Sequence, residues 1–193
     1  MKFRDAIIIL FFCLICHEGK CQWQIIYQDS NFYNMGVQFL NPDTGFVVGV
    51  NWSASTSQQG IIFRTTDGGL TWDSTFTSAG NFMIEFPSTQ IGYTGGHDGS
   101  VMKTIDMGNS WNQANSWCCN DYSNGYFFNN DSGFVILWPG TIVETTNGSN
   151  SWQSGQSIGG YSPFPGIGSI QFLNDSVGII AAGYNGIYSR TND

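Results

Sequence analysis

Positive charge is scarce in this sequence. Only 6 of its 193 residues are lysine or arginine, against 14 aspartates and glutamates, and the formal net charge is −8. A protein that binds nucleic acid through its phosphates needs many cationic side chains, so this composition excludes a binder of that kind. We therefore expect no nucleic acid among its partners.

Long apolar runs are lacking as well. The run from Ala6 to Cys16 has 11 residues, whereas a membrane-spanning helix needs about 20. Lys2 and Arg4 precede this run and polar residues follow it, which is the pattern of an export signal. We expect residues 1–21 to be a signal peptide, the mature chain to be secreted or held at the cell surface, and no membrane span within the mature chain.

Cysteine and histidine are nearly absent after residue 21, where only Cys118, Cys119 and His97 occur. No zinc-binding spacing exists, so we expect no metal site and no cofactor. The adjacent cysteines leave two alternatives open, a vicinal disulfide or two free thiols in a loop. Three basic and twelve acidic side chains follow residue 21. This net charge of −9 predicts a soluble surface that repels anionic polymers and lipid head groups.

Glycine and aromatic residues are abundant and recur at a fixed interval. Glycine accounts for 25 residues and aromatic residues for 16% of the chain. In one pattern, a phenylalanine stands six residues before a glycine that an apolar or aromatic residue follows; the glycines are Gly45, Gly92, Gly133 and Gly178. These glycines are 47, 41 and 45 residues apart. A period of this length with several short strands is typical of a propeller blade.

Alternation and turn residues predict four strands in the first repeat, at 37–40, 45–50, 61–66 and 71–76. Asparagine, aspartate and glycine between these segments favour turns, because the first two bond their own backbone and glycine accepts positive φ. Helical periodicity is absent from the mature chain. The sequence therefore predicts an all-β fold, a β-propeller of four-stranded antiparallel blades at about 36–77, 81–116, 124–157 and 168–193.

The third turn of each repeat carries a related motif. Residues 65–72 read TTDGGLTW, residues 104–111 read TIDMGNSW, and residues 145–152 read TTNGSNSW. The motif resembles the Asp-box, or BNR, repeat, in which the carboxylate accepts hydrogen bonds from turn amides, glycine takes the left-handed conformation and tryptophan packs under the hairpin. Its residues here are Asp67, Gly69, Trp72, Asp106, Gly108, Trp111, Asn147, Trp152 and Asp193. The third copy departs at Asn147 and Ser149, and we expect a weaker turn there.

The segments GFVVG and GIIFRTTDGGLTW are similar to repeats of the photosystem II assembly and stability factor type, which also occur in exported bacterial proteins. Propellers of the sortilin, sialidase and xyloglucan-active glucanase types share the box. The resemblance implies a β-propeller whose boxes are structural turns on the rim, away from the ligand site. It implies a fold and not an activity.

The fourth copy of the motif stops at Asp193, before its glycine and tryptophan. Two alternatives follow. The chain is an N-terminal fragment of a larger ring, which is our expectation, or residues 23–27 supply a closing strand for a small ring of four blades. On the first alternative, a C-terminal sorting domain missing from this sequence could follow.

No catalytic residues stand out. A sialidase-like site resembles a grip of three arginines, and the mature chain has only Arg64 and Arg190. A glycosidase needs two carboxylates across a sugar-sized gap, and spacing singles out no pair among Glu85, Asp98, Asp121 and Asp131. His97 beside Asp98 could form an acid/base dyad, but an ordinary hairpin is the expected role. We expect no enzyme; the alternative is a carbohydrate-active enzyme with catalytic residues beyond residue 193.

Aromatic residues outside the box motif are the candidate ligand-binding residues. They are Trp52, Trp117, Tyr122, Trp138, Tyr161 and Tyr184. Such rings could stack on sugars or a peptide, or fill gaps between blades. Ring stacking is little screened by salt, so binding by these rings alone should persist at high ionic strength. The sequence predicts a noncatalytic extracellular propeller that binds an unidentified protein or glycan; a structural surface-array module is the remaining alternative.

Overall fold

The structure is a computed structural model. It describes residues 25, 28, 30–52, 59–117, 120–157, 169–174, 176–182 and 187–191. Several predicted features lie outside these residues. They are the signal peptide at 1–21 and all of the candidate closing strand at 23–27 but Ile25. The predicted residues Cys118, Cys119, Tyr161, Tyr184 and Asp193 also lie outside them.

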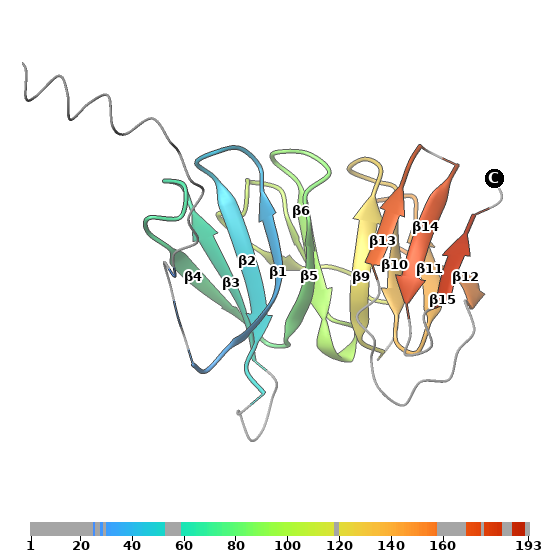
Figure 1. Cartoon of the computed structure of the whole chain (residues 1–193), viewed down its shortest axis with the longest axis horizontal. Coiled ribbons are helices and arrows are strands. Elements are labelled where there is room, and N and C mark those ends of the chain that lie inside the picture. Colours follow the sequence, from blue (N-terminus) through green and yellow to red (C-terminus); the bar gives the residue numbers. More distant parts are fainter. Residues whose placement is uncertain are drawn as a thin grey trace, which may run out of the picture.

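The described residues form four antiparallel sheets, which stand side by side in sequence order (Figure 1). The first contains β1 (Tyr33–Phe39), β2 (Gly45–Val50), β3 (Gly60–Thr65) and β4 (Asp73–Thr77). The second contains β5 (Asn81–Glu85), β6 (Gly92–Gly96), β7 (Val101–Thr104) and β8 (Asn112–Gln113). The third contains β9 (Tyr122–Phe127), β10 (Gly133–Leu137), β11 (Thr141–Thr145) and β12 (Gln153–Ser157). The fourth contains β13 (Ser169–Phe172), β14 (Gly178–Ala182) and β15 (Ile187–Arg190).

The sheets pack through their first strands. Strands pair in chain order within each sheet, and β1 lies against β5, β5 against β9, and β9 against β13. This is the radial order of propeller blades, with the first strand of each blade innermost. Among the described residues, the one helical element is the short 3₁₀ turn η1 (His97–Gly99), and none of their helices is long and apolar enough to cross a membrane.

The recurring phenylalanine and glycine pattern is a ring stack between blades. In the first three sheets, the residue after the glycine stacks on the phenylalanine of the next sheet: Phe46 on Phe86 at 4.6 Å, Tyr93 on Phe127 at 4.1 Å, and Phe134 on Phe172 at 5.6 Å between ring centroids. The glycine is required because the inner phenylalanine of its own sheet lies over it. A Cβ at Gly92, for example, would stand 2.5 Å from the Phe86 ring.

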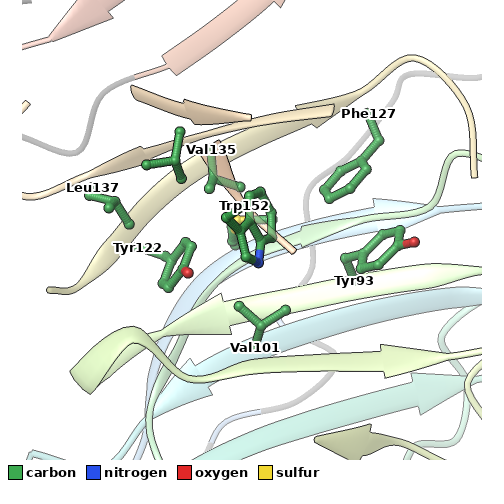
Figure 2. Close-up of a cluster of buried hydrophobic side chains, with 9 residues drawn as sticks. Tyr93, Val101, Tyr122, Phe127, Val135, Leu137 and Trp152 are labelled. Carbon is green, nitrogen blue, oxygen red and sulfur yellow. The ribbon is translucent and has the colours of Figure 1, made fainter. Parts of the chain in front are cut away.

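The largest buried cluster lies between the second and third sheets (Figure 2). Tyr93 and Val101 of the second sheet meet Tyr122 and Val135 of the third, and Trp152 packs among them. Trp111 occupies the equivalent place between the first and second sheets, where its ring meets Phe46 and Phe86 edge-on. The expectation that these box tryptophans pack under their own hairpins is therefore wrong, because they fill the space between neighbouring blades.

Candidate functional site

The connections between strands divide between two ends of the sheets. The Asp-box edge carries the Asp-box turns and the turns between the first and second strands; the backbone N–H of Gly68, for example, donates to the carbonyl of Asp43 at 2.8 Å. This edge lies along the top of Figure 1. The loop edge, at the bottom, carries the connections from second to third strand and from one sheet to the next. There the N–H of Trp138 donates to the carbonyl of Asp121 at 2.8 Å.

Each complete Asp box is held by its carboxylate. Asp67 Oδ1 accepts the Thr65 hydroxyl at 2.8 Å and the Thr71 N–H at 2.9 Å, and Oδ2 accepts the Thr71 hydroxyl at 2.6 Å. Asp106 repeats this arrangement with Thr104 and Ser110. These hydrogen bonds, first of all that from the Thr71 hydroxyl, lower the pKa of Asp67 to about 2. The carboxylates are occupied within their own turns and serve the fold.

The third box keeps the geometry without the charge. Asn147 Oδ1 accepts the Ser151 N–H at 2.9 Å, but Asn147 Nδ2 now donates to the Ser151 hydroxyl at 2.8 Å. Ser149 replaces the motif glycine at φ 63°, a left-handed conformation that costs a non-glycine residue free energy. Its hydroxyl is buried without a hydrogen-bond partner. These features are the physical reasons to expect a weaker third turn.

Asp67→Asn is expected to lower the thermal unfolding midpoint at neutral pH by a few degrees, because the turn donors lose a charged acceptor. The pKa of Asp67 falls from 3.8 to about 2 in the fold. The ionised carboxylate therefore stabilises the fold above pH 3.8, and this contribution disappears as the pH falls through 2. Melting curves across this range should converge for the two proteins. Asp73→Asn, which removes an exposed carboxylate from the same sheet, is the control, and an equal loss in it would refute the assignment.

The basic side chains among the described residues lie at the Asp-box edge. Arg64 Nε donates to the Met107 carbonyl at 3.1 Å, and Lys103 Nζ donates to the Gly148 carbonyl at 3.1 Å. Both bonds join one sheet to the Asp-box turn of the next. Arg190 ends β15 in the same register as Arg64. The loop edge contains no lysine or arginine among its described residues.

The loop edge instead carries a row of aromatic and acidic side chains, which we call the loop-edge strip: Trp52, His97, Asp98, Asp121 and Trp138. The Trp52 ring lies 6.4 Å from the His97 ring, edge to face. His97 Nδ1 is 3.1 Å from Asp98 Oδ2, and the N–H of Asp98 donates to Asp121 Oδ1 at 3.0 Å. The strip thus joins residues of the first three sheets.

Three of the predicted ligand-binding tryptophans are accessible on this edge. Trp52 is 46% exposed, Trp117 is 40% exposed and Trp138 is 39% exposed. Phe82 of β5, which sequence reasoning did not select, stacks on Trp52 at 5.8 Å between centroids. No local sequence signal marks this contact, because it joins two sheets.

The prediction for Tyr122 is wrong. This side chain is fully buried in the core between the second and third sheets, and its hydroxyl accepts the Trp117 N–H at 2.9 Å. The predicted blade began at residue 124, but β9 begins at Tyr122, whose partner is Leu137 across an irregular register. Tyr122 therefore belongs to a strand and not to a ligand-binding loop.

The structure brings together acidic residues that spacing did not pair. His97, Asp98 and Asp121 each offer an atom that lies within 4.8 Å of the others, so they are the described residues that could hold a cation. Asp121 Oδ1 is turned to the backbone of Asp98 and Asp98 Oδ2 to His97. The two carboxylates thus contact neighbouring groups of the chain. They do not face each other across a gap for a sugar, as the carboxylates of a glycosidase do. Glu85, whose pKa burial raises to about 7, lies elsewhere, at the end of β5 opposite Tyr93.

No protein-family model and no curated protein sequence matches the chain. Solved structures do. YCF48 bound to D1 peptide aligns at a TM-score of 0.60 with 20% identity over 89% of this chain and 56% of its own. YCF48 from Cyanidioschyzon merolae gives 0.59 with 13% identity over 89% and 60%. The GH74 xyloglucanase from Xanthomonas campestris gives 0.52 with 8% identity over 84% and 35%.

These likenesses establish the fold. The chain spans little more than half the length of the two YCF48 chains, and 35% of the xyloglucanase. At these identities the alignments do not show the activity or the partner of this chain. They confirm, at the level of the fold, the resemblance to photosystem II assembly factor repeats and the prediction of four-stranded antiparallel blades. The chain has the all-β architecture of an Asp-box β-propeller.

Proposed function

We propose that the chain is a noncatalytic binding module and that the loop-edge strip binds a segment of a partner protein. The observation that carries the proposal is the exposure of tryptophans at one edge: Trp52 and Trp138 of the strip are 46% and 39% exposed, and Trp117 of the same edge is 40% exposed. Tryptophan is enriched at protein interfaces and in binding hot spots. The alignment with a YCF48 propeller bound to a D1 peptide supports a peptide as ligand.

The structural roles of the remaining polar groups support a module without catalysis. The Asp-box carboxylates are occupied in their own turns, and Arg64 and Lys103 are bonded to carbonyls of neighbouring turns. We place the mature protein outside the cytoplasm on the pattern of residues 1–21 alone. The xyloglucanase likeness concerns the fold alone. A glycan ligand is the alternative to a peptide, and the experiment below distinguishes the two.

The test is a peptide array and a glycan array, each probed with the wild type and with Trp52→Ala/Trp138→Ala. We expect peptide binding by the wild type and a loss of about tenfold or more in the double variant, because hot-spot tryptophans contribute over 1 kcal/mol each. Trp72→Ala removes a half-buried tryptophan from the opposite edge and should bind normally.

Undiminished binding by the double variant would show that the ligand does not bind at the strip. Binding to glycans and not to peptides would show that the partner is a carbohydrate and not a protein. Release of reducing sugar from an array polymer would show an enzyme. Melting curves of all three proteins establish that the substitutions leave the fold intact.

A further inference from the structure

The centre of the loop-edge strip is anionic. Asp98 and Asp121 come from the second blade and from the segment that leads into the third. The backbone N–H of Asp98 donates to the side-chain Oδ1 of Asp121 at 3.0 Å and so links the two segments. The side chain of Asp98 is 74% exposed. One cationic group can reach both carboxylates, because the nearest ligand atoms of the His97, Asp98 and Asp121 group lie within 4.8 Å of one another.

No lysine or arginine among the described residues reaches this centre. The described basic side chains are Arg64, Lys103 and Arg190. The first two are bonded to carbonyl oxygens at the Asp-box edge, and Arg190 ends a strand at that same edge. Only His97 stands beside the carboxylates, and a histidine is neutral unless protonated. Within the part of the chain that the structure describes, these two neighbouring negative charges thus have no lysine or arginine partner.

Two accessible tryptophans belong to segments bonded to or in contact with the anionic centre. Trp52 contacts His97 on one side, and the backbone of Trp138 is bonded to that of Asp121 on the other. Tryptophan is the best aromatic partner for an ammonium or guanidinium group. Its apolar surface also covers the methylene stem of lysine or arginine while the charged end reaches a carboxylate.

We propose that the loop-edge strip recognises a partner segment by a lysine or arginine side chain, whose charge lies at Asp98 and Asp121 and whose stem packs against Trp52 or Trp138. This inference rests on the proposed function and adds the chemistry of the ligand. It also changes the expected salt dependence. Stacking alone would persist at high ionic strength, whereas a contribution from exposed carboxylates is screened as salt is added.

The experiment begins with a random peptide array probed with the full chain. Bound peptides are resynthesised in two forms, with and without charge: lysine or norleucine, arginine or citrulline. Affinities are measured by fluorescence anisotropy for the wild type and Asp98→Asn/Asp121→Asn. Asp43→Asn/Asp73→Asn is the matched control, because it removes two exposed carboxylates elsewhere on the chain.

We expect lysine or arginine to be enriched in the bound peptides. Removing the peptide charge or both strip carboxylates should weaken binding about tenfold or more, as for charge pairs at other interfaces. The control should bind within about twofold of the wild type, since screened charges outside the site matter little. Raising the NaCl concentration from about 50 to about 500 mM should reduce the difference between the wild type and the Asp98→Asn/Asp121→Asn variant.

Different outcomes separate this inference from the proposed function. Binding that needs Trp52 and Trp138 but neither the peptide charge nor the carboxylates would overturn the inference and leave the binding module standing. Binding that is lost in EDTA would show a metal ion at the carboxylates and would also overturn it. Absence of peptide binding by the wild type would overturn both.

Discussion

Gly96→Ala is expected to destabilise the fold by about 3 kcal/mol or more, the upper end of what overpacking costs. Gly96 ends β6, immediately before the His97 turn, and pairs with Asn81 of β5. A Cβ there would overlap the carbonyl oxygen of Gly80 and stand 2.8 Å from the amide nitrogen of Phe82. Backbone atoms cannot move aside as a flexible side chain can, so the two strands would have to separate.

The same substitution should disturb the loop-edge strip. The N–H of His97 donates to the carbonyl of Gly80 at 2.9 Å, so the close approach of Gly96 to Gly80 places His97 and Asp98. Urea unfolding measures the loss of stability. Gly36→Ala is the control, because a Cβ at this strand glycine meets a Val48 methyl group at 3.2 Å, and it should cost less than about 1 kcal/mol. Equal stability of Gly96→Ala and Gly36→Ala would contradict the assignment.

The blades were predictable because their determinants repeat. Each glycine such as Gly92 makes room for a phenylalanine of its own blade, and in the first three blades the residue after it stacks on the next blade. Each Asp box closes its turn with donors at most four residues away. A local rule that recurs near a period of 40 to 47 residues is visible in the sequence without knowledge of the packing.

The loop-edge strip was only partly predictable. Composition pointed to Trp52 and Trp138, but their alignment with Asp98 and Asp121 depends on how three blades are placed side by side. These residues do not repeat from blade to blade, so periodicity does not mark them. The positions of Trp111 and Trp152 were missed for a related reason, since Trp152 Nε1 donates to the carbonyl of Asn115 at 2.8 Å, which is a contact between blades.

The two edges therefore differ in what their residues do. At the Asp-box edge, charged groups such as Asp67 and Lys103 bond turn atoms of their own or the neighbouring blade. At the loop edge, tryptophan rings remain accessible and Asp98 is largely exposed. A propeller that binds a partner needs both, a repeated end that fixes the blades and an irregular end whose side chains differ between blades.

Tyr122→Ala is expected to cost about 3 to 5 kcal/mol, as for other large buried aromatic residues. The Tyr122 ring is fully buried and lies 6.1 Å from the Trp152 ring, in the cluster that joins the second and third sheets (Figure 2). Its removal leaves a cavity at the contact between two blades. Guanidinium unfolding should show the loss as a lower midpoint with the slope unchanged.

Tyr122→Phe separates the hydroxyl from the ring. The Trp117 N–H donates to this hydroxyl at 2.9 Å, so loss of the hydroxyl should cost about 1 to 2 kcal/mol of stability. If Tyr122 were a ligand-binding residue, Tyr122→Phe would weaken peptide binding and leave stability unchanged. The buried position predicts the reverse. Both variants should have a lower unfolding midpoint, and the alanine variant should be much less stable than the phenylalanine variant. The phenylalanine variant should bind peptide within about twofold of the wild type, since its ring still fills the core.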